Sequence, residues 1–179
     1  MRPSNRTAIL DAAVRVVEEG GVTAVTLDAV AAEAGLTKGG LIYHFPSRDA
    51  LLGGIHEHLA AQWEEQLEEQ LGGPAAEATP EERLAAYALV STNPATRAEL
   101  LLQIEAAFTE HSAPWNAVLD RWTVPADEGL RTTPVEHVIA RLAADGLWMY
   151  ETLGGGRLDE ETRQAIADHL AAMIRDKPA

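Results

Sequence analysis

A chain of 179 residues, 46% of them hydrophobic, can bury a core as one domain or as a small domain beside a larger one. It contains no cysteine, which excludes disulfides and cysteine metal sites, and it shows neither a signal-peptide apolar run nor an uncharged 18-residue stretch. We therefore expect a cytoplasmic protein with no membrane partner.

The net charge of -14 is unevenly distributed along the chain. Residues 1–50 hold five cations and six anions, whereas the remainder holds nine cations and 22 anions. Strong acidity argues against nucleic acid as a partner. That argument applies to the C-terminal part and leaves the nearly neutral N-terminal part open.

Helix signals cover nearly the whole sequence, and no long run alternates with period two, so we predict an all-α protein of nine helices. Paired glycines after residue 19 end the first helix, and Thr26, Thr37 and Ser47 are the expected N-caps of the next three. These four helices are expected at about 5–19, 27–34, 38–44 and 48–71.

Five further helices are predicted in the second half. Thr79 and Thr133 are each followed by proline and, three residues on, by glutamate, a pattern typical of a helix start. Pro125 either kinks or ends the seventh helix, and both possibilities remain open. The five helices are expected at about 80–89, 94–111, 114–124, 134–153 and 160–175, with Asp159 as the N-cap of the last.

The second and third helices, joined at Gly35, predict a helix-turn-helix. Ala31 and Ala32 are small enough for the two helices to cross closely, and Leu36 and Leu41 are the expected apolar anchors. The third helix is then free to enter the major groove of double-stranded DNA.

The residue types around this third helix suit DNA contact. A lysine can reach guanine edges or phosphates, glycines let the backbone approach DNA, and phenol, imidazole and hydroxyl groups can donate to phosphate oxygens. Taken alone, the sequence TKGG at residues 37–40 is equally compatible with a loop or a helix end, and the spacing of a phosphate-binding Walker loop is absent. The candidate DNA contacts are Thr26, Thr37, Lys38, Gly39, Gly40, Tyr43, His44, Ser47 and Arg48.

The N-terminal segment from residue 8 to 52 reads AILDAAVRVVEEGGVTAVTLDAVAAEAGLTKGGLIYHFPSRDALL. It resembles the N-terminal pattern of the TetR family of transcriptional regulators nearly position by position. The resemblance implies a three-helix DNA-binding domain at residues 1–48 and a helical ligand-binding and dimerisation domain at residues 49–179. It also implies a homodimer on a palindromic operator, acting as a repressor that a small, largely apolar molecule releases. Ile42 and Gly40 depart from the family pattern, which has polar or reading side chains at these positions.

The eighth and ninth predicted helices carry an apolar stripe at three-to-four spacing. The stripe could serve the protein's own core, or it could form a four-helix bundle with a second protomer, which the resemblance favours. The candidate dimer residues are Val135, Val138, Ile139, Leu142, Gly146, Tyr150, Ile166, Leu170 and Met173.

Four tryptophans is a generous number for 179 residues, and Trp115, Trp122 and Trp148 could line an apolar pocket with a few polar groups in the proposed regulatory domain. Aromatics at helical spacing are also typical of an ordinary core. The candidate ligand contacts are Tyr87, Gln103, Phe108, His111, Trp115, Trp122, Trp148 and Met149.

The sequence offers no motif for catalysis, a cofactor or a metal. His56 and His58 lie two residues apart on different faces of a helix, and the remaining histidines have no ligand spacing. We therefore expect neither an enzyme, a cofactor nor a metal site. The alternative to a DNA-binding regulator is a helical ligand-binding or protein-interaction module that no longer binds DNA specifically.

Overall fold

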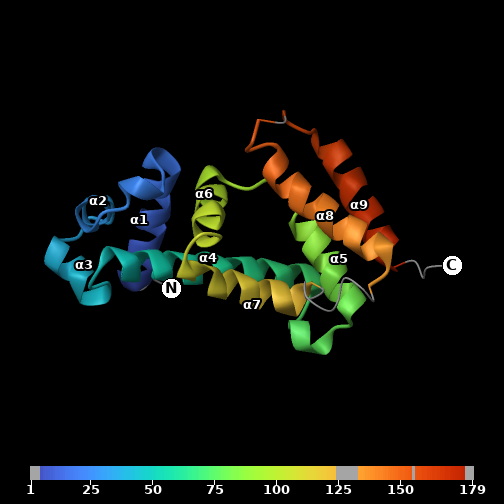
Figure 1. The fold of residues 1–179 in the computed structure, drawn as a ribbon, viewed down its shortest axis with the longest axis horizontal. Coiled ribbons are helices and arrows are strands. Elements are labelled where there is room, and N and C mark those ends of the chain that lie inside the picture. The colour runs from blue at the N-terminus through green and yellow to red at the C-terminus, as the bar shows by residue number, and fades with distance from the viewer. Residues whose placement is uncertain (1–4, 124–132, 155, 176–179) are drawn as a thin grey trace. The chain divides into compact units, whose positions relative to one another are not determined.

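The computed structural model describes residues 5–123, 133–154 and 156–175. Within these ranges the chain forms nine α-helices and no strand, which confirms the predicted all-α class (Figure 1). The helices are α1 (Asn5–Gly20), α2 (Leu27–Glu33), α3 (Lys38–His44), α4 (Arg48–Leu71), α5 (Pro80–Val90), α6 (Arg97–Ala106), α7 (Ala113–Trp122), α8 (Val135–Tyr150) and α9 (Glu160–Arg175). Three short 3-10 turns, η1 (Val22–Ala24), η2 (Ala75–Glu77) and η3 (Glu110–Ser112), lie between them.

The described residues separate into two compact units. The first contains the chain up to Ala61 together with Thr96–Trp115, and the second contains Gln62–Ala95 and the chain from Asn116 onward. The long helix α4 therefore contributes residues to both units. The predicted functional division after residue 48 falls at the first residue of α4 and stays a prediction.

Local capping fixes the helix-turn-helix. The hydroxyl oxygens of Thr26, Thr37 and Ser47 each accept a hydrogen bond from the amide three residues on, at 3.0–3.1 Å, as predicted. Gly35 ends α2 with a φ of +66°, and the amide of Leu36 donates to the Ala31 carbonyl at 2.9 Å. This closing pattern needs a left-handed residue, which is why glycine stands at the turn.

The core of the first unit lies between α1, the helix-turn-helix and the first half of α4. Leu41 and Phe45 are buried there, while Leu36 is only half-buried. Gly54 of α4 provides the space for the Phe45 ring, because a Cβ at residue 54 would lie 2.6 Å from Phe45 Cε1. The interior positions of α1 are Ile9, Leu10, Ala12, Ala13 and Val17.

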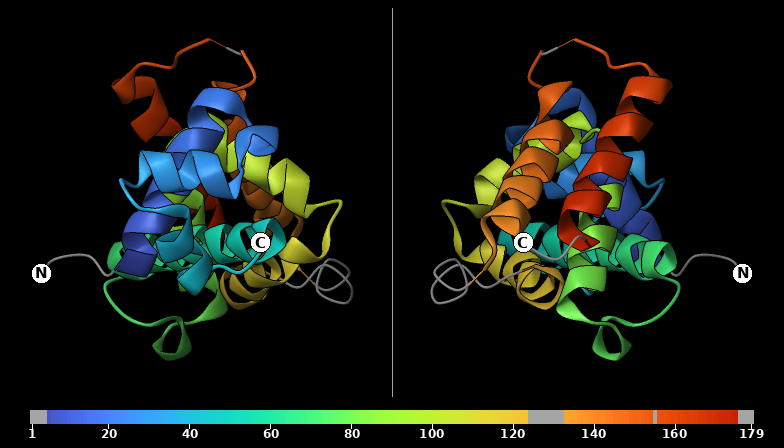
Figure 2. Two further views of the ribbon diagram at one scale, coloured as in Figure 1. Left: turned by 90° about the vertical axis from the view of Figure 1, so that its left-hand side faces the viewer. Right: turned by 90° about the vertical axis from the view of Figure 1, so that its right-hand side faces the viewer.

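The second unit is built on α5, α8 and α9, and α8 and α9 lie side by side in Figure 1 and in the right-hand view of Figure 2. One face of α8 is buried within the chain through His137, Ala140, Ala144 and Leu147. His137 Nε2 lies 2.9 Å from the carbonyl oxygen of Ile174 and ties α8 to the end of α9.

Two predicted helix starts are wrong. α6 begins at Arg97 rather than at Pro94, because Thr96 and Glu99 form a capping box that sets the start locally. α8 begins after Pro134, with no side-chain cap, so Thr133 does not cap it. Pro125 lies outside the described residues, and α7 ends at Trp122.

Candidate functional site

Helix α3 is held by one side and offers the other to solvent. Leu41 is its only buried residue, whereas Tyr43 is 85% exposed and Ile42 is 40% exposed. Lys38, Gly39 and Gly40 are also exposed at the start of the helix. A large aromatic side chain with this exposure contributes little to the protein's own core, so Tyr43 is available to a partner.

The two glycines of α3 differ in their surroundings. A Cβ at Gly39 would meet nothing within 4 Å, so this position is open to an approaching surface. A Cβ at Gly40 would lie 3.3 Å from Thr37 Oγ1, the oxygen that caps the helix. The absence of a side chain at Gly40 therefore leaves space for the Thr37 cap, and it also lets a partner approach the backbone of α3 closely.

The three capping hydroxyls keep hydrogen-bonding capacity. Each of Thr26, Thr37 and Ser47 accepts one backbone bond through its oxygen, which leaves the O–H free to donate. His44 is half-buried and its ring meets the edge of the Tyr43 ring at a centroid distance of 5.2 Å. These groups are placed around the exposed face of α3, where phosphate oxygens could accept from them.

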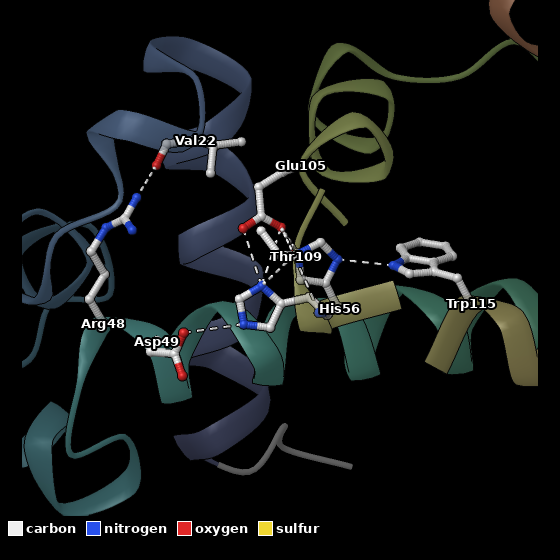
Figure 3. Close-up of polar contacts among 8 residues, drawn as sticks. Val22, Arg48, Asp49, His56, Glu105, Thr109 and Trp115 are labelled. Atoms are coloured by element: carbon white, nitrogen blue, oxygen red, sulfur yellow. Dashed lines mark hydrogen bonds and ion pairs between the residues drawn. The ribbon is translucent and has the colours of Figure 1, made fainter. Parts of the chain in front are cut away.

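Arg48 is bound to the protein's own backbone. Its Nε donates to the Val25 carbonyl at 2.8 Å, and its Nη2 donates to the Val22 carbonyl at 2.9 Å (Figure 3). These bonds tie the first residue of α4 to the turn that precedes α2. Arg48 thus stabilises the segment that leads into the helix-turn-helix. Its predicted contact with a phosphate stays a prediction.

A polar cluster that spacing along the sequence does not reveal joins α4, α6, η3 and the start of α7 (Figure 3). The indole Nε1 of Trp115 donates to His56 Nδ1 at 2.9 Å, and His56 Nε2 lies 2.9 Å from Glu105 Oε2. His111 Nδ1 lies 3.2 and 3.3 Å from the two carboxylate oxygens of Glu105. Its Nε2 lies 3.4 Å from Asp49 Oδ1.

The Trp115 bond fixes the proton on His56. An indole N–H only donates, so His56 Nδ1 must accept and the single proton of the neutral ring is on Nε2, which donates to Glu105. A second proton on Nδ1 would face the indole N–H and break this bond. Burial lowers the pKa of His56, and the negative charge of Glu105 opposes this effect.

The same geometry bears on metal binding. The donor atoms of His56, Glu105 and His111 lie within 4.8 Å of one another, close enough for one ion to bridge them. Binding through His56 Nε2 would move the ring proton to Nδ1, opposite the Trp115 N–H. The two imidazole rings are also stacked, with an interplanar angle of 16°, so their in-plane lone pairs do not converge on one point. The arrangement favours a hydrogen-bonded chain over a preformed metal site.

Acid is expected to weaken the fold through His56. Its pKa is lowered in the folded protein, so the unfolded chain binds more protons below pH of about 6.5 and stability falls as the pH decreases through that range.

Replacing Trp115 with phenylalanine leaves His56 Nδ1 without its donor, which lowers the free energy of unfolding by about 1–3 kcal/mol at pH 8. In that variant Nδ1 can take a proton without losing a bond. Urea unfolding should therefore show that Trp115→Phe lowers the free energy of unfolding by less at pH 5 than at pH 8. An equal loss at both pH values would contradict the assignment of the His56 proton to Nε2.

The comparisons with known proteins identify the family. Residues 9–55 match the model described as bacterial regulatory proteins, tetR family, and residues 81–175 match the model described as tetracyclin repressor-like, C-terminal domain. The chain belongs to the TetR family. It is a DNA-binding transcriptional regulator whose C-terminal part corresponds to the ligand-binding domain of that family. No curated protein matches it significantly.

Solved structures share the TetR-family fold along nearly the whole chain. EbrR, a multidrug binding protein solved with imidazole, is 24% identical with a TM-score of 0.55, over 94% of this chain and 90% of that one. The fatty acid degradation regulator FadR from Bacillus halodurans is 18% identical with a TM-score of 0.63, over 97% and 96%. A proposed TetR-family regulator from Vibrio parahaemolyticus is 19% identical with a TM-score of 0.64, over 95% and 98%.

The candidate ligand residues of this TetR-family chain fall in both compact units. Gln103, Phe108, His111 and Trp115 belong to the first unit, and the remaining four, Tyr87, Trp122, Trp148 and Met149, belong to the second. Their exposure differs widely: Trp122 is fully buried, whereas Phe108 is 87% exposed. Ligand contact by these residues therefore stays a prediction.

Polar groups accompany the buried aromatics of the second unit. The Tyr87 hydroxyl donates to Asp145, a residue that sequence reasoning did not single out, and the Tyr87 ring meets the edge of Trp63. Burial raises the pKa of Asp145, and the Tyr87 hydrogen bond opposes this effect. A separate groove of about 380 Å³ is lined by Gln66, Glu69, Gln70, Val90 and Asn93, and it contains none of the predicted ligand residues.

Helix α8 of this regulator has a second apolar face that the described part of the chain leaves exposed. Of the candidate dimer residues, Val135, Ile139, Leu142, Gly146 and Tyr150 are exposed, and Val138, Ile166 and Met173 are half-buried. Leu170 is 4% exposed and packs within its own chain.

Among the residues that the structure describes, no helix is both long and apolar enough to cross a membrane.

Proposed function

We propose that this regulator is a homodimeric, cytoplasmic repressor that binds a palindromic operator and leaves it when a small, largely apolar ligand binds residues 49–179. The observation that carries the proposal is the exposed face of α3, where Tyr43 is 85% exposed beside Lys38 on a helix anchored only by Leu41. We propose no enzymatic activity for the chain.

The DNA contacts divide by the kind of group they recognise. Lys38 is placed for guanine edges or phosphates at the start of α3, with Gly39 and Gly40 allowing close approach. Phosphate oxygens are contacted by the O–H groups of Tyr43 and the capping residues and by His44. Because Gly40 and Ile42 offer no reading group, sequence selection also depends on DNA shape.

The exposed face of α8 is the proposed dimer contact. The exposed residues of this face recur at three-to-four spacing, namely Val135, Ile139, Leu142, Gly146 and Tyr150, and Leu153 extends the row beyond the helix. Exposed apolar rows of this kind mark association surfaces. A dimer about a twofold axis would present two copies of α3 to half-sites about 34–36 Å apart.

The effector class is proposed from the tryptophan and tyrosine residues of the C-terminal part. EbrR, the multidrug binding protein that shares this fold, was solved with imidazole and with ethidium. The Tyr87, Trp63 and Asp145 group combines aromatic rings with a partly buried carboxylate. Such a combination suits a planar ligand, including one with positive charge.

Selection from random duplex DNA, followed by titration at several salt concentrations, tests the proposal. Lys38→Ala and Tyr43→Phe are each expected to weaken operator binding by about 1–3 kcal/mol, because each removes one proposed contact with the operator. Arg157→Ala is the control, because it removes the same charge from an exposed position outside the helix-turn-helix.

Two results would count against the proposal. If no duplex sequence is selected at low salt, the chain is a helical ligand-binding or interaction module instead of a DNA-binding repressor. If Arg157→Ala weakens binding as much as Lys38→Ala, net charge and not α3 governs the affinity. The effector is tested in two steps. Quenching of tryptophan fluorescence by a panel of compounds identifies ligands, and each ligand is then tested for release of the bound operator.

A further inference from the structure

The cations that the structure describes in the N-terminal DNA-binding part are already engaged within the protein. The structure describes four Lys or Arg side chains in residues 5–61, and each lies against an acidic group or a backbone carbonyl. The pairs are Arg6 with Glu57, Arg15 with Glu33, Lys38 with Asp28, and Arg48 with the carbonyls of Val22 and Val25. This surface therefore presents little net positive charge to a duplex.

Lys38 and Asp28 connect the two helices of the helix-turn-helix. Lys38 Nζ lies 2.9 Å from Asp28 Oδ2, and the two side chains are 54% and 71% exposed. Asp28 stands in the first turn of α2 and Lys38 at the first position of α3, so the pair bridges the starts of both helices. The only cation of α3 is thus held by a carboxylate on the same exposed surface.

This pair has different consequences for the two ways in which DNA is bound. Contact with phosphates supplies the sequence-independent part of affinity, and a carboxylate beside the lysine opposes it on every duplex. A guanine edge offers two acceptors in fixed positions and can compete for the lysine only where that base is present. Because the ion pair is exposed, exchanging its carboxylate for another acceptor is inexpensive.

We propose that Asp28 is a specificity-determining residue, which holds Lys38 away from phosphates and releases it to the base edges of the correct operator. This inference rests on the proposed contact of Lys38 with DNA. It assigns Asp28 a role although the residue makes no attractive contact with DNA itself. Asp28 lowers affinity for all DNA, and it lowers affinity for incorrect DNA most.

The test replaces Asp28 with asparagine, which keeps the shape and removes the charge. Binding of the full-length protein is measured on a random-sequence duplex and on the selected operator, at several salt concentrations. We expect Asp28→Asn to tighten random-duplex binding roughly two- to fivefold, the range of an exposed ion pair. The salt dependence on that duplex should steepen by up to about 0.9 in the logarithmic slope, one phosphate contact. Operator binding should tighten less, so the specificity ratio falls.

Glu33→Gln is the matched control. It makes the same change of charge on the same helix and also frees a cation, Arg15, which lies on α1. We expect it to leave the specificity ratio unchanged. In a Lys38→Ala background, Asp28→Asn should lose most of its effect, because no lysine remains to be released.

The outcomes separate this inference from the proposed function. If the parent binds its operator but Asp28→Asn and Glu33→Gln behave alike, the role of Asp28 is overturned and DNA binding stands. An unchanged effect of Asp28→Asn in the Lys38→Ala background would also overturn it, because Asp28 would then act by general repulsion. Failure of every variant and of the parent to bind any duplex would overturn the proposed function itself.

Discussion

Replacing Leu41 with alanine is expected to lower the free energy of unfolding by about 2–5 kcal/mol and to abolish operator binding. Leu41 is fully buried and is the only buried side chain of α3, so it holds the helix against the rest of the first unit. A helix of seven residues is not stable in water without such packing. The loss should appear in urea unfolding followed by circular dichroism, and in a mobility-shift titration.

Ile42→Ala is the control for this prediction, since it shortens the neighbouring side chain of the same helix. Ile42 is 40% exposed, so its loss should change stability by less than about 0.5–1 kcal/mol. Comparable losses for the two variants would mean that α3 is not anchored through Leu41. If a stably folded Leu41→Ala protein still binds the operator, then Leu41 is not needed to hold α3 in its DNA-binding position.

Placing a charge on the exposed face of α8 is expected to separate the protomers. Ile139→Glu would bury a carboxylate in the apolar dimer contact, which is costly, and sedimentation should then report a monomer at micromolar concentration. Operator affinity should fall by about 100-fold or more, because the second half-site contact no longer benefits from being linked to the first. Circular dichroism should stay that of the folded protein, since the face is exposed within each chain.

Ile104→Glu is an unusually close control for Ile139→Glu. Both isoleucines lie within α-helices and both are 49% exposed, so the two exchanges are chemically identical. Ile104 lies on α6, a different helix from α8, which carries the proposed dimer face. We expect Ile104→Glu to remain a dimer. Monomers in both variants, or dimers in both, would contradict the assignment of the interface to α8.

Features set by neighbouring residues could be predicted from the sequence. The caps at Thr26, Thr37 and Ser47 and the glycine that ends α2 depend on groups within a few residues, and all four were correct. The start of α6 was also local, but a proline at residue 94 gave the stronger signal and masked the Thr96 capping box. Competing local signals therefore produced the error at that boundary.

Features that depend on packing between distant residues could not be predicted in this way. His56 meets Glu105 and Trp115 across 49 and 59 positions of the chain, and only the approach of α6 and α7 to α4 brings them together. One signal was available, because His56 falls on the apolar stripe of α4 with Leu52, Ile55 and Leu59. A polar residue on such a stripe needs a buried partner, although the stripe does not say which one.

The two hydrogen bonds of Arg48 bear on how such a regulator could be re-engineered. Both acceptors are main-chain carbonyls, so these two hydrogen bonds do not involve the side chains at residues 22 and 25. The cap hydrogen bonds likewise end on backbone amides. The exposed positions of α2 and α3 can thus be exchanged for those of another operator specificity while the scaffold that presents them is retained. Because Arg48 holds main-chain atoms, the exposed residues of α2 and α3 are suitable positions for transferring another operator specificity into a designed regulator.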